Sequence, residues 1–285
     1  MLQAIRPQQW LKNLLVFVPL ITAHVTAGGA WGLALLAFVA LSLTASGVYL
    51  LNDLIDLPHD RAHPRKRARP LASGRLSILS GLLLSPLLML AGLAVAALLS
   101  GALAMVILVY LLTTSLYSVF LKRFALIDVF VLAGLYTLRI VVGGLAVNIV
   151  LSEWLIAFSI FTFLSLAIVK RYGELTDAVR NERPPTPGRG YQPGDLRLLV
   201  SLGAAAAFSA VLIFSLYISS EAVQGLYSQP LVLWGVALLV LLWLCHMLLV
   251  SHRGEMDDDP VVFAVRDPVS LSLGAGCAAF FLAAV

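Results

Sequence analysis

Long apolar stretches alternate with short polar segments along the whole chain. Each apolar stretch is long enough to cross the ~30 Å hydrocarbon core of a membrane as an α-helix. The stretches are continuous and rich in Leu and Ala, without the alternation at every second residue that marks strands of a membrane β-barrel. The pattern predicts nine transmembrane helices, at about residues 12–28, 31–54, 76–98, 101–121, 126–148, 152–171, 196–219, 230–251 and 268–285.

Composition agrees with this pattern. Of the 285 residues, 60% are hydrophobic and only 12% are charged, about half the charged fraction of an ordinary soluble domain. No small-residue cleavage site follows the first apolar stretch, so we expect that stretch to be a retained span. Cys245 and Cys277 lie in apolar stretches without a CxxC spacing, which indicates packing residues and not a disulfide or zinc site. We therefore expect an all-α integral membrane protein with residues 1–285 in one polytopic domain.

The basic residues predict the orientation of the chain. With a cytoplasmic N-terminus and an outside C-terminus, all 19 Lys and Arg residues except Arg139 fall on or beside the cytoplasmic side, as the positive-inside rule requires. The sequence pI near 9.2 then reflects topology and an anionic substrate or lipid, and no nucleic-acid partner is expected. The cytoplasmic loops on this map are residues 55–75, 122–125, 172–195 and 252–267.

Three carboxylates follow the second apolar stretch at helical spacing. Asp53, Asp56 and Asp60 fall within an arc of about 60° on a helix, and Asn52 widens this face to about 100°. Acidic residues contribute little to topology and are costly at the end of a span unless they are paired or bind a metal. Oxygen ligands of this kind suit Mg²⁺, with Mn²⁺ as an alternative.

A basic run at residues 63–70, HPRKRARP, follows these carboxylates. Its cations are suited to the remaining charge of a polyanionic substrate, so the two segments together predict a metal–diphosphate site. Pro58 disfavours helix at Leu57. We therefore expect the helix to kink or end there, with Asp60 reaching the metal from a loop or through water.

Other charged residues leave alternatives open. Arg139 lies inside a span and must face the interior of the bundle, where Asp128, a carboxylate of the Asp-rich segment or the substrate are equally acceptable partners. The acidic run Asp257, Asp258 and Asp259 is typical of a solvated loop, with a lid or a second metal contact as the alternative. The Pro- and Gly-rich segment 180–194 predicts a mobile connector that could cover the site.

The segment from Asn52 to Asp60 matches the NDxxDxxxD motif in full, and so resembles the first Asp-rich motif of the UbiA superfamily of intramembrane prenyltransferases. The resemblance implies a nine-helix bundle. Tyr117, Lys122 and Arg123 also resemble the Tyr/Lys-Arg element at the end of the family's fourth helix. The second Asp-rich motif of the aromatic prenyltransferases is not present in its usual form, because that region reads KRYGEL at residues 170–175.

These departures resemble one branch of the superfamily, the polyprenyl-phosphate phosphoribosyltransferases, typified by the decaprenyl-phosphate enzymes of arabinan-making bacteria. The resemblance rests on the RPxQWxKN opening, the HPxKxRP run and KRxxEL, and it extends over almost the whole chain. The matching segments are residues 6–13, 52–74, 117–128, 138–144, 170–175 and 253–267.

The resemblance implies transfer of the 5-phosphoribosyl group of phosphoribosyl diphosphate (PRPP) to a polyprenyl phosphate, with release of pyrophosphate. Mg²⁺ on Asp53 and Asp56 would neutralise the leaving group, and the lipid phosphate, already an anion, needs no general base. Attack opposite the leaving group predicts inversion. The implied setting is the bacterial inner membrane, with the site facing the cytoplasm and the product supplying pentose to cell-envelope glycans. Homo-oligomer formation is left open.

The expected site residues divide by role. Asp53, Asp56 and Asp60 are the expected catalytic residues, and with Asn52 they are the expected metal ligands. The expected substrate-binding residues are Asn52, Lys12, His63, Lys66, Arg67, Arg69, Tyr117, Lys122, Arg123, Arg139, Lys170, Arg171, Tyr172 and Glu174. Lys66 and Arg69 are the first choices for the donor phosphates, while Lys12 and Arg6 lie where a lipid phosphate would be.

Two other functions are compatible with parts of the pattern. Aromatic prenyl transfer from a prenyl diphosphate would use the same first motif, but it predicts a second Asp-rich motif. A nine-helix transporter predicts ionisable residues spread through the bilayer or helices broken at its midplane, whereas only Arg139 lies inside a predicted span away from the charged side. Both alternatives therefore explain less of the sequence than phosphoribosyl transfer.

Overall fold

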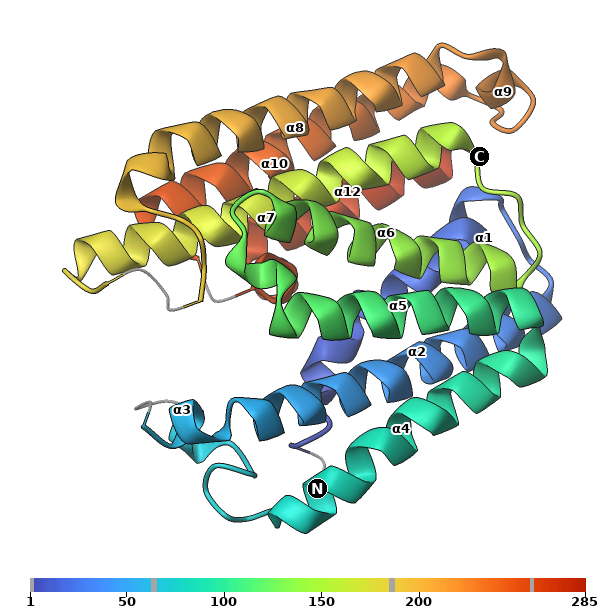
Figure 1. Ribbon diagram of the computed structural model, residues 1–285. Coiled ribbons are helices and arrows are strands. Elements are labelled where there is room, and N and C mark those ends of the chain that lie inside the picture. Colours follow the sequence, from blue (N-terminus) through green and yellow to red (C-terminus); the bar gives the residue numbers. More distant parts are fainter. Residues whose placement is uncertain (1–2, 63–65, 185–187, 257–258) are drawn as a thin grey trace. The chain divides into compact units, whose positions relative to one another are not determined.

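The computed structural model describes residues 3–62, 66–184, 188–256 and 259–285, and within these ranges every regular element is helical (Figure 1). The α-helices are α1 (Val18–Thr22), α2 (Gly28–Ile55), α3 (Leu57–Ala62), α4 (Ile78–Leu99), α5 (Gly101–Val119), α6 (Ile127–Ala146), α7 (Glu153–Arg180), α8 (Leu196–Ile218), α9 (Glu221–Gln224), α10 (Leu233–Arg253), α11 (Pro260–Ala264) and α12 (Pro268–Ala284). Short 3-10 helices are η1 (Pro7–Phe17), η2 (Lys66–Ala68), η3 (Leu121–Arg123), η4 (Pro193–Asp195) and η5 (Pro230–Val232).

Seven helices in the described residues are long and apolar enough to cross a membrane. The other two expected spans differ in form. The stretch expected at 12–28 consists of η1 followed by α1, and α12 at the C-terminal end has only 17 residues. The membrane-protein class follows from the seven long helices, while the count of nine and the orientation of the termini stay predictions. The seven helices are Gly28–Ile55, Ile78–Leu99, Gly101–Val119, Ile127–Ala146, Glu153–Arg180, Pro193–Ile218 and Pro230–Arg253.

The chain divides into two compact units, and each is described by itself. The first comprises residues up to 120 together with 138–150, and the second comprises 121–137 and 151–285. Helix α6 contributes its first half to the second unit and its second half to the first. The expectation of one polytopic domain stays a prediction.

Small residues set the packing of the first unit, where α2 lies against α4 and α5 (Figure 1). A Cβ atom on Gly47 would meet the backbone of Ser85, and one on Gly92 would meet the backbone of Ala40. The Ser85 hydroxyl donates to the carbonyl of Gly47 at 2.8 Å. Close approach of backbones through small residues is typical of membrane helices, for which water supplies no hydrophobic drive.

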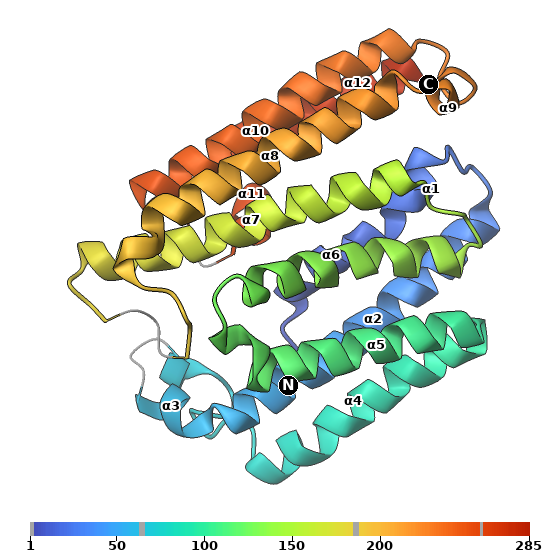
Figure 2. The same ribbon diagram turned by 45° about the horizontal axis from the view of Figure 1, so that its top comes forward.

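The second unit is built on α7, which packs against α8 and α10, while α12 packs on α10 (Figure 2). Gly203 of α8 faces Ile168 of α7, and the Ser165 hydroxyl donates to the Gly203 carbonyl at 3.0 Å. The apolar exterior of both units leaves many large side chains exposed, such as Leu98 and Leu238. Such a surface suits a lipid environment.

Candidate functional site

The Asp-rich segment lies where α2 ends and α3 begins. Helix α2 ends at Ile55 with Asp56 as its C-cap. The helical path resumes almost at once in α3, because the Asp60 amide donates to the Asp56 carbonyl at 2.9 Å. Pro58 occupies the first turn of α3, where its missing N–H costs nothing. The expected break at Leu57 is confirmed. Asp60 belongs to this short helix and not to a loop.

Arg69 joins two of the three carboxylates. Its Nη1 atom donates to Asp53 Oδ1 at 3.1 Å and to Asp60 Oδ2 at 2.6 Å. Both carboxylates are buried, at 3% and 2% exposure, while Asp56 and Asn52 are half-buried. One cationic nitrogen therefore holds two buried carboxylates from α2 and α3 at a single point.

Arg6 reaches the same carboxylate from the N-terminal segment. Its Nη2 atom donates to Asp53 Oδ1 at 2.5 Å, and its guanidinium carbon lies 5.4 Å from the centre of the Tyr49 ring. The sequence placed Arg6 beside Lys12 for a lipid phosphate, whereas the structure places Arg6 on the Asp-rich segment. Arg6 is thus a contact of the Asp-rich segment that no sequence pattern placed there.

The donor set at this point fits a divalent cation. The Arg69 nitrogen contacts one oxygen of Asp53 and one of Asp60, so a cation at this position would be coordinated by both carboxylates. Mg²⁺ needs only one or two carboxylates when water and substrate phosphate complete its coordination shell. Within the described residues no three His, Cys, Asp or Glu side chains form a ready-made metal cluster. The remaining ligands would therefore come from the substrate, from water, or from Asp56 and Asn52 after side-chain movement.

The other basic residues of this segment lie on the surface. Lys66 and Arg67 are exposed on the turn η2, and His59 is exposed on α3. Arg75 donates to the Ala68 carbonyl and, at 3.0 Å, to Gln3 Oε1, which holds the segment against the N-terminus. His63, an expected phosphate contact, lies outside the described residues.

A second polar group lies inside the first unit. Arg139 Nε donates to Asn13 Oδ1 at 3.0 Å, and its Nη2 atom donates to the Tyr110 hydroxyl at 3.1 Å. The Asn13 amide in turn donates to the Ser42 hydroxyl at 3.0 Å. Lys12, like Arg139, is buried. Arg139 therefore faces the interior, as expected.

The three residues expected at the end of the fourth span differ in solvent exposure. Tyr117 and Lys122 are half-buried, and Arg123 is exposed on η3. Tyr117 belongs to the first unit, whereas Lys122 and Arg123 belong to the second.

The KRxxEL element lies in a buried ionic cluster of the second unit. Arg171 Nε donates to Asp128 Oδ2 at 2.5 Å, and Arg171 Nη1 donates to Glu174 Oε2 at 2.6 Å. Asp128 is fully buried and also accepts from the Tyr191 hydroxyl at 2.5 Å. Asp128, which the sequence offered as a partner for Arg139, thus has Arg171 and Tyr191 as partners.

The described part of the Pro- and Gly-rich segment is fastened to this cluster. Tyr191 is buried, its hydroxyl accepts from the Leu126 amide at 3.0 Å, and Arg189 lies 3.7 Å from Asp128. Burial and the hydrogen bond to Asp128 raise the pKa of Tyr191 above its ordinary value. The expected mobile connector is thus anchored at residues 189–191. No spacing pattern in the sequence marked Tyr191.

The remaining expected residues of this region also have protein partners. Lys170 pairs with Asp259 at 3.6 Å, and the Tyr172 hydroxyl lies 2.8 Å from His252 Nδ1. Asp259 is buried and accepts from amides at the start of α11, so it is not part of a solvated loop. Asp257 and Asp258 lie outside the described residues.

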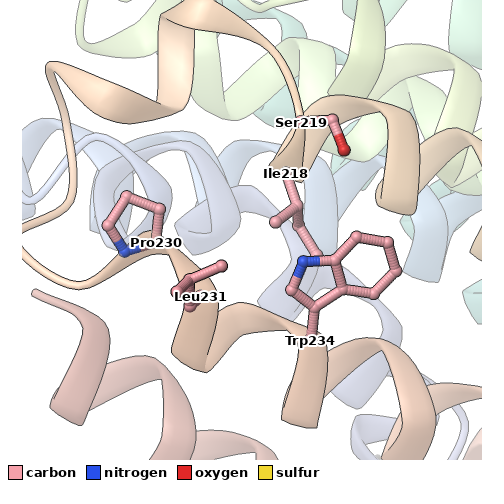
Figure 3. Close-up of a pocket in the computed structure, with 5 residues that line it drawn as sticks. All are labelled: Ile218, Ser219, Pro230, Leu231 and Trp234. Carbon is pink, nitrogen blue, oxygen red and sulfur yellow. The ribbon is translucent and has the colours of Figure 1, made fainter.

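A pocket of about 400 Å³ shares no lining residue with these polar groups (Figure 3). It is lined by Ile218, Ser219, Pro230, Leu231 and Trp234, at the end of α8 opposite to the Tyr191 segment. Leu231 is 81% exposed. The recess is open and mainly apolar, and it offers no charged group to a phosphate.

Comparison with known proteins gives consistent relatives. Residues 14–266 match the model of the UbiA prenyltransferase family. The protein y4nM of Sinorhizobium fredii is 41% identical over the whole chain, which spans 55% of its length. Nodulation protein NoeC of Azorhizobium caulinodans is 35% identical over 94% of this chain and 88% of its own. Decaprenyl-phosphate phosphoribosyltransferase of Mycolicibacterium smegmatis is 36% identical over 72% and 67%.

Solved structures show the same fold at low identity. A UbiA homologue from Archaeoglobus fulgidus, bound to DMAPP and Mg²⁺, superposes with a TM-score of 0.71 at 16% identity, covering 99% of this chain and 96% of its own. A digeranylgeranylglyceryl phosphate synthase gives 0.68 at 17% identity with the same coverage. With a family model matched from residue 14 to residue 266 and this fold, the protein belongs to the UbiA prenyltransferase family and is a multi-pass membrane enzyme.

Proposed function

We propose that this enzyme transfers the 5-phosphoribosyl group of PRPP to a polyprenyl phosphate and releases pyrophosphate in a Mg²⁺-dependent reaction. The observation that carries the proposal is the convergence of the buried carboxylates Asp53 and Asp60 on Arg69 and Arg6. Carboxylates for a metal and guanidinium groups for phosphate are the two requirements of a diphosphate donor.

The residues divide the work at the donor. Asp53, Asp56 and Asp60, with Asn52, would hold the metal, which when bound supplies charge neutralisation for the departing pyrophosphate. Arg69 and Lys66 are assigned to the donor phosphates. Held in this way, the anomeric carbon is presented in a fixed orientation, and positioning supplies much of the rate.

The acceptor needs little chemical help from the protein. A lipid phosphate is an anion at neutral pH, so it attacks the anomeric carbon without a general base. Its attack from the face opposite pyrophosphate inverts the α-linked donor to a β-linked ribosyl phosphate. We assign Lys12 and Arg139, both buried in the first unit, to this half of the site.

The KRxxEL element takes a supporting role in this proposal. Arg171 is bound by Asp128 and Glu174, so its charge is committed to protein carboxylates. Tyr172 and Glu174 likewise contact protein groups. Lys122, Arg123 and Lys170 are proposed as further phosphate contacts at the cytoplasmic face of a bacterial inner membrane, which the distribution of basic residues favours.

The names of two relatives support PRPP as the donor, while the name of a third says nothing about a donor. The Mycolicibacterium protein and its Corynebacterium glutamicum counterpart, 32% identical over 79% of this chain, are named decaprenyl-phosphate phosphoribosyltransferases. NoeC is named only for nodulation. The acceptor lipid and the final glycan are therefore to be identified by experiment.

The test is a transfer assay with the full chain in lipid nanodiscs. Radiolabelled PRPP, Mg²⁺ and polyprenyl phosphate should give a labelled lipid, and EDTA or Asp56→Ala should abolish it. Asp177→Asn, which alters an exposed carboxylate, should retain the activity. The proposal is wrong if no lipid is labelled while the same preparation consumes a prenyl diphosphate on an aromatic acid.

A further inference from the structure

Arg6 has an unusual backbone conformation. Its φ of 50° and ψ of 63° place it in the left-handed region, which non-glycine residues rarely adopt. The next residue is Pro7, and a residue before proline is normally extended. Backbone conformations of this kind are strained and persist only where surrounding contacts enforce them, often at functional sites.

One face of α2 enforces this conformation. The Ser46 hydroxyl donates to the carbonyl of Ile5 at 2.8 Å and accepts from the Trp10 indole at 3.0 Å. Tyr49 lies under the Arg6 guanidinium, and Asp53 accepts from it. Ser46, Tyr49 and Asp53 are three and four residues apart, so they share a face of the helix. That face holds the backbone before Arg6 and binds its side chain in the resting site.

The guanidinium groups occupy the oxygens that a metal would use. Oδ1 of Asp53 accepts from both Arg6 and Arg69, and Oδ2 of Asp60 accepts from Arg69. A cation that binds these carboxylates must compete with both arginines. The two arginines carry two positive charges against the two negative charges of Asp53 and Asp60, so adding a divalent cation leaves an excess that a diphosphate would neutralise.

The arginine side chains are partly exposed, while the carboxylates are buried. The side chains of Arg6 and Arg69 are 21% and 27% exposed, whereas those of Asp53 and Asp60 are 4% and 3% exposed. A guanidinium group also matches the paired oxygens of a phosphate. The exchange would break the ion pairs of the two arginines and the contact of Arg6 with Tyr49, and a phosphate reached from the solvent side would replace them.

We propose that Arg6 and Arg69 form an exchange clamp: they bind the carboxylates in the resting site and transfer to the donor's diphosphate when it binds with its cation. This inference rests on the metal–diphosphate site of the proposed function. It adds Arg6 to the donor site and gives Arg69 two alternate partners. It also predicts that these arginines oppose binding of the cation alone but favour binding of the diphosphate.

The test measures these two affinities separately in the full chain. Mn²⁺ alone is titrated by electron paramagnetic resonance, and inorganic pyrophosphate is titrated by calorimetry at saturating Mn²⁺. Arg6→Ala removes one charge-assisted contact with the carboxylates and Arg69→Ala removes two. Each variant should therefore bind Mn²⁺ at least about tenfold more tightly and pyrophosphate at least about tenfold more weakly. Arg61→Ala, an exposed arginine of α3, is the matched control and should change neither affinity by as much as threefold or so.

Opposite changes in the affinities for Mn²⁺ and for pyrophosphate distinguish the clamp from a purely structural role of the two arginines. Unchanged or weaker Mn²⁺ binding in both alanine variants would overturn the proposal. If Arg6→Ala does not fold, Arg6→Gln and Arg69→Gln replace the alanine variants with the same expected signs. If the two affinities change in opposite directions but the PRPP assay gives no labelled lipid, phosphoribosyl transfer is rejected and the clamp is retained. If the lipid is labelled but the affinities do not change in opposite directions, only the clamp is rejected.

Discussion

The two units each contain arginines bound to buried carboxylates, but the arginines closest to the carboxylates differ in exposure, with the partly exposed Arg189 only at the edge of the second cluster. In the first unit, the side chains of Arg6 and Arg69 are 21% and 27% exposed. In the second unit, the side chain of Arg171 is 2% exposed and that of Asp128 is fully buried. Desolvated ion pairs hold their partners firmly because breaking one leaves an uncompensated buried charge. Partly exposed arginines can instead exchange partners.

On the proposed function, this difference separates the donor site from a cluster that supports the fold. The cluster at Asp53 keeps cations that water and substrate can reach, as a site for a charged donor requires. The cluster at Asp128 joins α6, α7 and the Tyr191 segment through Arg171 and Tyr191. Replacements in the first cluster should therefore affect activity, and replacements in the second should affect stability.

The largest effect is expected from Asp53→Asn. Loss of this proposed metal ligand should lower the rate of the proposed transfer at least about 1,000-fold, or about 4 kcal/mol of transition-state stabilisation. The free energy of unfolding should change by less than about 1 kcal/mol, because the arginines that lose their partner remain in contact with solvent. Rates of labelled-lipid formation and unfolding in mixed micelles measure the two quantities. A large loss of stability would place Asp53 with the supporting cluster.

Arg171→Ala should have the next largest effect, on stability. It leaves the buried Asp128 carboxylate without its main counter-ion, which typically costs about 3–5 kcal/mol. The double variant Arg171→Met, Asp128→Leu should recover most of this loss, since apolar residues of similar size replace buried pairs at little cost. Equal stability of the single and double variants would show that the ion pair is not the cause.

Tyr191→Phe should have a smaller effect that depends on pH. Removing a hydroxyl bound to a buried carboxylate should cost about 1.5–3 kcal/mol at neutral pH. Because burial and Asp128 raise the pKa of Tyr191 in the folded state, its contribution is complete below the unfolded pKa of about 10 and is lost as the pH rises above it. The difference between the two proteins should therefore narrow in alkaline solution, as thermal unfolding at several pH values would show. A constant difference would contradict the role of the hydroxyl.

The smallest effect is expected at an exposed pair. Arg183 and Asp177 lie 3.3 Å apart with side chains 62% and 63% exposed, so Arg183→Ala should change stability by less than about 1 kcal/mol. Activity should remain at the level of the unaltered enzyme. A larger loss of stability would show that solvent exposure does not decide how much an ion pair of this protein contributes to stability.

The fold class and the acidic half of the candidate site could be predicted from local patterns. Helical spacing predicted that Asp53, Asp56 and Asp60 share a face, and the structure joins Asp53 and Asp60 through Arg69. Pro58 marked the break between α2 and α3. Arg69 was expected among the donor residues, and it contacts two of the three carboxylates. These features depend on residues close in sequence, so the geometry of one helix end is enough to predict them.

Other features depended on contacts between distant residues. Arg6 lies 47 positions before Asp53, and Tyr191 lies 63 positions after Asp128. Neither pair has a spacing signal, because whole helices and their connections lie between the two partners. The sequence therefore favoured a lipid phosphate for Arg6 and a solvated loop for Asp259.

The sequence by itself determined that this is a helical membrane protein with its charge chemistry at the ends of the spans, because hydropathy and helical period act over short stretches. Tertiary structure alone decided which arginine meets which carboxylate. It buried Arg171 beside Asp128 and left Arg6 and Arg69 partly exposed. The physical reason is that burial, which decides whether an ion pair is fixed or exchangeable, is a property of packed helices and not of any one segment.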